Sequence, residues 1–175
     1  MQCAVSEDEQ QGRFERLVLP HLDAAYNLAR WLAGDDHDAE DIAQEACVRA
    51  FRFVDGCRSG DGKAWLLTIV RNTAYSWLKK NRSLAPISLD DDEFAEMEDQ
   101  SVADRTFHSA DTDVLRAALE ALPPEFREIL VLREIEELSY KEIAEVAELP
   151  VGTVMSRLAR ARRQLQESVK EKDKS

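Results

Sequence analysis

The chain lacks the features that would place it in a membrane or make it depend on disulfide bonds. None of its 175 residues fall in a run approaching the roughly 18 to 20 apolar residues of a membrane-spanning helix, and the polar start lacks the basic end and apolar run of a signal peptide. Its three cysteines are odd in number and form no CxxC pair, which argues against a disulfide framework and a cysteine-rich zinc site. We therefore expect a cytoplasmic protein that makes no membrane contact of its own.

Recognisable catalytic motifs are also missing. The histidines His21, His37 and His108 have no serine or cysteine partner at a catalytic spacing, and the chain contains no HExxH sequence and no glycine-rich phosphate loop. The carboxylates follow patterns typical of solvated surfaces. The sequence therefore predicts a protein that is not an enzyme and that needs no cofactor or metal.

Reduced thiols are the simplest interpretation of the three cysteines. Cys47 falls on a helical stripe with Ala43, Ala50 and Val54, which predicts a core position. Cys3 and Cys57 can be exposed, so a redox role at either position stays open.

The net charge is −12, yet the basic residues are concentrated in two segments. Residues 62–82 contain five basic side chains and no acidic one, and residues 151–165 contain four arginines and no acidic one. Lysine and arginine bind nucleic acid by displacing counterions from phosphates. The two segments indicate DNA contacts, while the overall negative charge predicts that the free protein binds DNA weakly unless a larger partner presents it.

The first half of the chain has the pattern of helices. Apolar residues recur at helical spacing from Phe14 to Leu32, and Pro20 can split this run. A second helix runs to about Val54. After a glycine-rich loop, a third helix, amphipathic and basic, runs from Lys63 to about Lys80.

Residues 83–109 lose this periodicity and carry eight acidic side chains against one arginine, which is typical of a solvated linker. We therefore predict an all-α fold of two small helical domains joined by an acidic flexible linker. The expected division is a flexible N-terminus at 1–12, a first domain at 13–82, the linker at 83–111, a second domain at 112–168 and a charged tail at 169–175.

The second domain contains the outline of a helix-turn-helix between Ser139 and Leu165. Ser139 can cap the first helix with Glu142 in a capping box, and residues 148–150 make the turn. The predicted shared core consists of Ile143, Ala147, Val151, Val154 and Leu158. The second helix would then present polar side chains that can reach base edges and phosphates in a major groove. A helical hairpin with a solvated basic face is the alternative.

Specific segments resemble the extracytoplasmic-function (ECF) sigma factors of the sigma-70 family. The sequences ALPPEFREILVLREIEELSYKEIA at 121–144 and PVGTVMSRLARAR at 150–162 resemble region 4 of that family. The sequence DAEDIAQEACVRAF at 38–51 resembles region 2.2, and AWLLTIVRNTAYSWLKKNR at 64–82 resembles regions 2.3 and 2.4. The resemblance implies a transcription initiation factor that binds core RNA polymerase and recognises the −35 and −10 elements of promoter DNA.

The resemblance also implies a role for three sets of residues. Core polymerase would be contacted at its β′ clamp helices and β flap, with the clamp helices meeting Asp41, Gln44, Glu45 and Arg49. The −10 element would be opened and read by Arg58, Ser59, Asp61 and Asn72, with its phosphates held by Lys63, Lys79, Lys80 and Arg82. The −35 element would be read by Thr153, Ser156, Arg157 and Arg160. For each charged residue, a plain solvated surface position is the alternative.

Two positions depart from the family pattern. Many relatives carry Arg or Lys where this chain has Met155, which predicts an altered −35 preference. Glu148 stands where the turn often has glycine, which puts the local turn geometry in doubt.

Partners beyond polymerase follow from the same resemblance. The family is usually held inactive by an anti-sigma factor until a stress signal releases it, and we expect such a partner here. The acidic linker is interpreted as a tether, or alternatively as a strand that mimics RNA charge inside the polymerase.

Two rival functions agree less well with the sequence. A helix-turn-helix regulator would need a receiver domain or ligand pocket, whereas the first half is helical and basic. A decoy that binds an anti-sigma factor without starting transcription would leave both basic segments unexplained.

Overall fold

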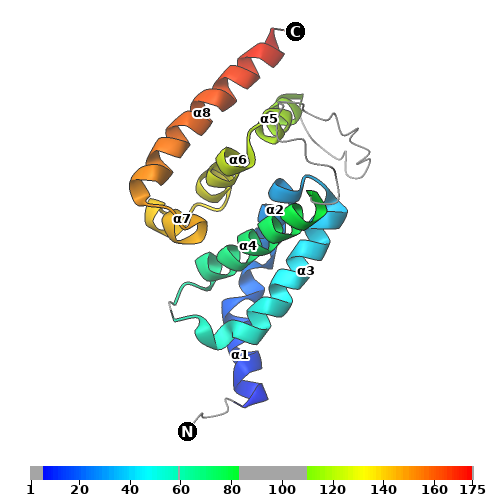
Figure 1. Ribbon diagram of the computed structural model, residues 1–175, viewed down its shortest axis with the longest axis vertical. Helices are drawn as coiled ribbons and strands as arrows, with labels where there is room; N and C mark the ends of the chain where they lie inside the picture. Colours follow the sequence, from blue (N-terminus) through cyan, green and yellow to red (C-terminus); the bar gives the residue numbers. More distant parts are fainter. Residues whose placement is uncertain (1–5, 59, 83–109, 175) are drawn as a thin grey trace.

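The computed structural model describes residues 6–58, 60–82 and 110–174, and these residues form helices joined by turns, with no strand among them (Figure 1). The all-α prediction is confirmed. Most of the predicted linker, together with Cys3 and Ser59, lies outside the described residues. Within the described ranges, no helix is long and apolar enough to cross a membrane.

Residues 6–82 form a first bundle. Its helices are α1 (Glu7–Leu17), α2 (Leu22–Ala33), α3 (Asp36–Phe53) and α4 (Gly62–Arg82), with short 3₁₀ turns η1 (Leu19–His21) and η2 (Val54–Gly56). Pro20 splits the first apolar run as predicted, because it falls inside η1. Gly34 ends α2 in the left-handed conformation at φ 79°, and the Asp35 side chain then caps α3 by accepting from the backbone N–H of Asp38 at 3.1 Å.

The expected flexible N-terminus at 1–12 is wrong for residues 7–12, which belong to α1. The Ser6 hydroxyl accepts from the backbone N–H of Glu9, and three acidic residues in the first turn favour the positive end of the helix dipole. The Phe14 and Phe51 rings meet edge to face at 5.4 Å, which attaches α1 to α3.

Residues 110–174 form a second bundle. It consists of α5 (Ala110–Glu120), α6 (Pro124–Leu130), the π-helical turn η3 (Val131–Ile135), α7 (Tyr140–Ala147) and α8 (Val151–Asp173). Pro124 opens α6 at its first position, where a missing N–H costs no hydrogen bond. The helix α8 continues to Asp173, so residues 169–173 of the predicted tail are helical.

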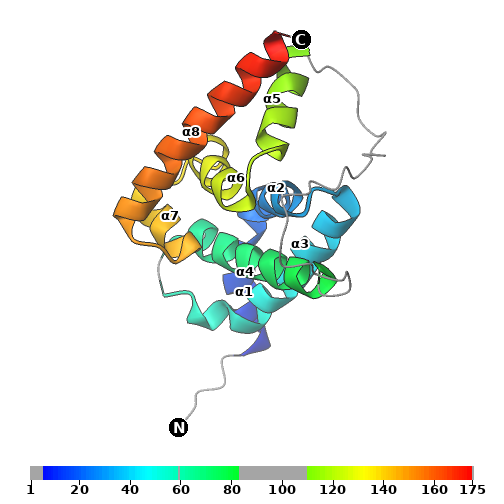
Figure 2. The same cartoon turned by 45° about the horizontal axis from the view of Figure 1, so that its top comes forward.

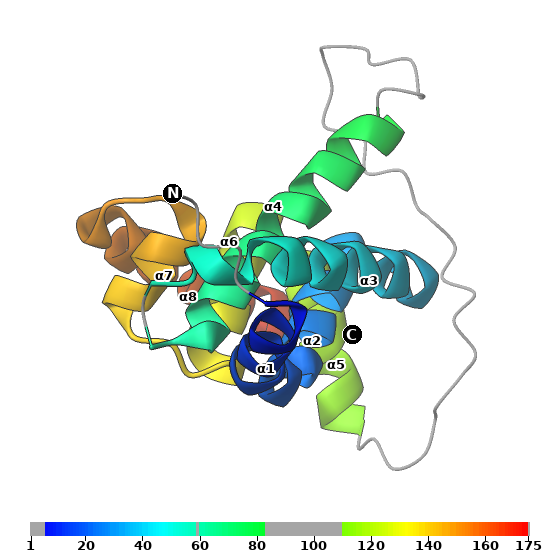
Figure 3. The same cartoon turned by 90° about the horizontal axis from the view of Figure 1, so that it is seen from below.

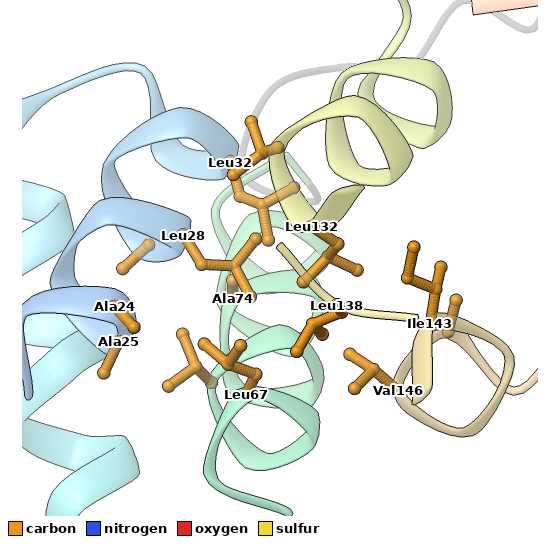
Figure 4. Packing of buried hydrophobic residues seen from close by; sticks show 14 of the residues in the cluster. Ala24, Ala25, Leu28, Leu32, Leu67, Ala74, Leu132, Leu138, Ile143 and Val146 are labelled. Atoms are coloured by element: carbon orange, nitrogen blue, oxygen red, sulfur yellow. The ribbon is translucent and has the colours of Figure 1, made fainter. Parts of the chain in front are cut away.

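The two bundles pack directly against each other. Helices α6 and α7 of the second bundle contact α2 and α4 of the first, an arrangement visible from both directions in Figures 2 and 3. Figure 4 shows Leu132 and Leu138 beside the side chains of α2 and α4, including Leu28 and Leu67. One apolar cluster therefore runs through both bundles, and the burial of this surface stabilises their contact.

Gly62 allows the start of α4 to approach the end of α1. A Cβ atom on Gly62 would lie 2.1 Å from the backbone oxygen of Leu17, closer than any real contact. The neighbouring Gly60 has nothing within 4 Å of the same position. The pair therefore offers a matched comparison of a crowded and an open glycine.

We expect Gly62→Ala to lower the free energy of unfolding by about 1 to 3 kcal/mol, because backbone must move to admit the methyl group. Gly60→Ala should leave it nearly unchanged. Thermal and urea unfolding followed by circular dichroism measures both. Equal stability of the two variants would show that the close approach of α1 to α4 is not formed in solution.

Candidate nucleic-acid and polymerase-binding surfaces

The outer face of α3 presents the residues predicted to contact core polymerase. Asp41, Gln44 and Glu45 are exposed, and the partly exposed Arg49 pairs with Glu45 at 2.5 Å. Val48 lies on the same face and is 51% exposed. Sequence reasoning missed Val48, although an apolar residue seven positions after Asp41 falls on the same helical stripe.

The start of α4 is fixed by Asp61. Its carboxylate accepts from the backbone N–H groups of Lys63 at 3.1 Å and Ala64 at 3.3 Å, so this predicted DNA-contacting residue caps the helix. A hydrogen bond with the Glu142 side chain, from the second bundle, lowers the pKa of Asp61, and the two backbone donors lower it further. Asp61 therefore caps α4 and lies beside Glu142 of the second bundle.

A cavity of about 340 Å³ lies beside this loop. It is lined by Arg13, Arg16, Leu17, Cys57, Arg58 and Gly60. Arg13 is positioned by a hydrogen bond from its guanidinium to the Cys57 carbonyl at 3.2 Å. Sequence reasoning did not select Arg13 or Arg16, because they lie on α1, more than 40 residues before the loop.

Cys57 is buried at 3% exposure, which contradicts the expectation that it can be exposed. Cys57 follows η2 and lies beside α1. Nothing in the sequence indicated that α1 would cover this position. Cys47 is partly buried, and burial raises the pKa of its thiol. A raised pKa keeps the thiol protonated and poorly reactive.

The second half of α4 leaves its polar side chains accessible. Asn72, Lys79 and Lys80 are exposed. Arg82 ends the helix, and its side chain lies outside the described part of the structure.

The first half of α4 is engaged by the second bundle. The Lys63 ammonium donates to the backbone oxygen of Glu136 at 2.7 Å and lies 3.3 Å from the Glu136 carboxylate. Further along α4, Arg71 forms an ion pair and hydrogen bond with Glu128. The Tyr75 hydroxyl donates to the other carboxylate oxygen of Glu128 at 2.7 Å.

Glu128 is 1% exposed, which is unusual for a carboxylate. Burial raises the pKa of Glu128, and the Arg71 charge and the Tyr75 hydroxyl oppose that rise. Burial and the charge of Glu128 raise the pKa of Tyr75, so the hydroxyl keeps its proton and remains a donor. The carboxylate thus receives donors at both oxygens, and both donors come from α4.

Arg127 gives the second bundle another attachment. Its guanidinium donates to the carbonyl oxygens of Leu119 and Glu120 at the end of α5 and of Leu122 in the turn that follows, at 2.7 to 3.1 Å. It also donates to the Trp31 carbonyl near the end of α2 at 2.8 Å. One side chain therefore satisfies carbonyl groups at two helix ends that have no partner within their own helix.

The helix-turn-helix is formed by α7 and α8. The predicted capping box is present, because Ser139 accepts from the Glu142 backbone N–H at 3.2 Å while Glu142 accepts from the Ser139 N–H at 2.7 Å. Glu148 adopts the left-handed conformation at φ 55°, so the turn forms without the glycine that this conformation favours. Ile143, Ala147, Val154 and Leu158 are buried as predicted, whereas Val151, the first residue of α8, is 42% exposed.

The outer face of α8 carries the residues predicted to read DNA. Ser156 and Arg160 are exposed, and Thr153 and Arg157 are partly buried. Met155 is 52% exposed and lies one turn after the exposed Val151, so these two form an apolar strip beside the polar residues. Arg162 pairs with Glu134 of η3 at 2.6 Å.

Comparison with known proteins matches both bundles. Residues 17–84 match the family model of sigma-70 region 2, and residues 112–165 match that of sigma-70 region 4. The ECF RNA polymerase sigma factor SigE of Mycolicibacterium smegmatis is 34% identical over 94% of this chain, and the chain spans 64% of its length. The RNA polymerase sigma-H factor of Pseudomonas aeruginosa is 37% identical, with 85% of this chain and 82% of that protein covered.

A solved structure agrees with these relatives. The sigma factor RpoE of Bartonella quintana, crystallised with the anti-sigma factor NepR, has a TM-score of 0.76 at 31% identity, covering 94% of this chain and 98% of that one. This chain therefore belongs to the extracytoplasmic-function sigma factors of the sigma-70 family.

Proposed function

We propose that this protein binds core RNA polymerase and directs it to promoters by recognising −35 and −10 elements, and that it acts in the cytoplasm, where polymerase works. The observation that carries the proposal is the presence, in one chain, of a region 2 bundle with a basic helix and a region 4 bundle with a helix-turn-helix. Catalysis then belongs to the polymerase, and the chain supplies binding surfaces alone.

In this proposal the outer face of α3 docks on the β′ clamp helices. Asp41, Gln44, Glu45 and Arg49 supply the polar contacts, and Val48 supplies an apolar centre. Interfaces gain most of their affinity from a desolvated centre surrounded by polar contacts. The exposure of Val48 inside a charged face supports this arrangement.

The loop before α4 and the exposed face of α4 would bind the −10 element. Arg58 and Asn72 would contact unstacked bases, with Ser59 and Asp61 from the same loop, and the phosphates would be held by Lys63, Lys79, Lys80 and Arg82. The cavity beside Arg58 adds Arg13 and Arg16, whose charges suit a phosphate or the polar edge of an unstacked base.

The outer face of α8 would enter the major groove at the −35 element. Thr153, Ser156, Arg157 and Arg160 are the polar contacts we propose, and the second bundle would also meet the β flap. Anti-sigma control is supported by the relative in Bartonella quintana, which was crystallised with an anti-sigma factor.

The first test is transcription in vitro with purified core polymerase and a pool of genomic promoter fragments, followed by sequencing of transcript 5′ ends. We expect discrete start sites that share upstream −35 and −10 motifs. Replacing Asn72 or Arg160 with Ala should reduce these transcripts by about tenfold or more, because each removes a base contact.

The matched controls are Asn27→Ala and Arg116→Ala, which change the same residue types at exposed positions outside the proposed surfaces. Both should keep wild-type transcript levels. Failure of the wild-type protein to bind core polymerase would refute the proposed function. Binding without specific starts would favour a decoy for an anti-sigma factor.

Met155 gives the −35 contact a chemical preference. Its side chain is apolar and exposed, on the side of α8 that we propose to face DNA, and the exposed Val151 side chain extends the apolar strip. Within a major groove, the feature that suits an apolar side chain is the methyl group of thymine. We therefore propose that Met155 packs against a thymine methyl in the −35 element.

Replacing thymine by deoxyuridine removes that methyl group and leaves base pairing unchanged. We expect deoxyuridine at one or two −35 positions to weaken holoenzyme binding about fourfold, the value for one buried methyl group. The Met155→Gln variant should show no such loss at those positions. Competition binding with fragments substituted one thymine at a time measures this, and wild-type tolerance of every substitution would rule out the contact.

A further inference from the structure

The cavity beside the loop that follows η2 has an unusual lining for an acidic protein. Of the described residues that line it, three are arginines, Arg13, Arg16 and Arg58, and none is acidic. The chain as a whole carries a net charge of −12. Three guanidinium groups around one hollow concentrate positive potential there. The cavity therefore favours an anion.

Two of these arginines are positioned by the first bundle. A terminal nitrogen of Arg13 donates to the Cys57 carbonyl at 3.2 Å, and the Arg16 Nε donates to the Gly12 carbonyl of the same helix at 3.2 Å. A guanidinium has five N–H donors, so each side chain has further donors for a ligand. The Arg13 Nε also lies 3.9 Å from the Asp55 carboxylate, but both side chains are more than one-third exposed, so this pair is weak.

The helix that carries Arg13 and Arg16 is fixed by contacts inside the first bundle. The Phe14 ring packs on the Phe51 ring, and the Gln10 side chain donates to the Phe51 carbonyl at 2.9 Å, so α1 is tied to the end of α3 (Figure 1). Gly62 admits the end of α1 against the start of α4. Polymerase and DNA take no part in these contacts. The cavity is therefore formed in the free protein.

The chemistry and the size of the cavity suit a small phosphorylated molecule. The fork of N–H groups on a guanidinium matches two oxygens of a phosphate. A phosphate carries close to two negative charges, which three arginines balance even with Asp55 counted. The volume of about 340 Å³ falls within the roughly 300 to 1,000 Å³ of small-molecule pockets, and Leu17 and the buried Cys57 supply an apolar wall.

We propose that Arg13, Arg16 and Arg58 bind the phosphate of a small phosphorylated molecule, such as a nucleotide, in the free protein. The organic part of the ligand packs against Leu17 and Cys57. The consequence of binding rests on the proposed function, which assigns the same arginines to the −10 strand. A bound ligand then competes with promoter DNA, and initiation responds to the concentration of that ligand.

Calorimetric titration of the free protein with inorganic phosphate, AMP and adenosine tests the site directly. We expect AMP to bind with a Kd of about 1 mM or below, phosphate to bind more weakly, and adenosine to give no signal. Arg16→Gln and Arg58→Gln should each weaken AMP binding about tenfold, because each removes a charge-assisted hydrogen bond. Arg116→Gln is the matched control, because it removes the same charge at an exposed position on α5.

These two substitutions separate binding from folding. Arg16 hydrogen-bonds within its own helix and Arg58 is exposed, so thermal unfolding of both variants should match that of the wild type. Amide NMR spectra then locate the ligand. AMP should shift the signals of Cys57 and Gly60, whereas shifts confined to the arginines of α8 would place the ligand elsewhere and overturn the proposal.

A second measurement distinguishes a free ligand from a nucleotide of the promoter strand. Fluorescence anisotropy follows the binding of holoenzyme to promoter DNA without nucleoside triphosphates, with AMP absent or at about ten times its Kd. AMP should weaken the wild-type complex about elevenfold by simple competition, and the Arg16→Gln complex only about twofold, because that variant binds AMP tenfold more weakly.

Three results would count against the proposal. Free protein that binds neither phosphate nor AMP at about 10 mM would overturn it, and a weaker Arg16→Gln complex with promoter DNA would then assign the arginines to the DNA strand alone. AMP binding without any effect on the promoter complex would contradict the competition. Wild-type holoenzyme that fails to bind promoter DNA would instead refute the proposed function, and the calorimetric result would still decide the phosphate site.

Discussion

The buried carboxylate of Glu128 is the interaction on which the arrangement of the two bundles depends. A buried charge is costly unless it is paired and hydrogen-bonded, and the partners of Glu128 are Arg71 and Tyr75, both on α4. Those partners are available when α6 lies against α4. The surrounding leucine side chains could pack in several registers. The Glu128 carboxylate has both of its donors in only one of these registers, so it selects the observed packing of the two bundles.

Sequence periodicity predicted most of the helices because it reports which face of a helix is buried. It does not report what covers that face. The apolar positions of residues 124–147 were assigned to the core of the second bundle, and two of them, Leu132 and Leu138, also contact the first bundle. Glu128 carried no sequence signal, because one acidic residue in a helix is ordinarily solvated. The docking of the bundles was therefore beyond prediction, although every side chain involved was visible.

The surfaces proposed for polymerase and DNA were predicted from family resemblance, and their roles stay predictions. The structure adds what surrounds each residue. Asp61 is a helix cap, and Lys63 is engaged across the interface. Val48 and Arg13 were missed for different reasons. Val48 is an apolar residue within a charged stripe, so it was not counted among the polar contacts. Arg13 is distant from the loop in the sequence and approaches it only in the folded protein. The local sequence pattern predicted the helix-turn-helix well, because its cap, its turn and its core all lie within 27 consecutive residues.

Arg127 illustrates how one side chain restricts the paths open to evolution. Its guanidinium reaches four carbonyl oxygens, two at the end of α5, one in the turn after α5 and one near the end of α2. A lysine has three donors on a single nitrogen and cannot span acceptors on both sides of a planar fork. Replacement of arginine by lysine is ordinarily one of the best tolerated substitutions. At position 127 it is therefore unfavourable. Across descendants of this protein, position 127 should hold its identity while the charged residues around it drift.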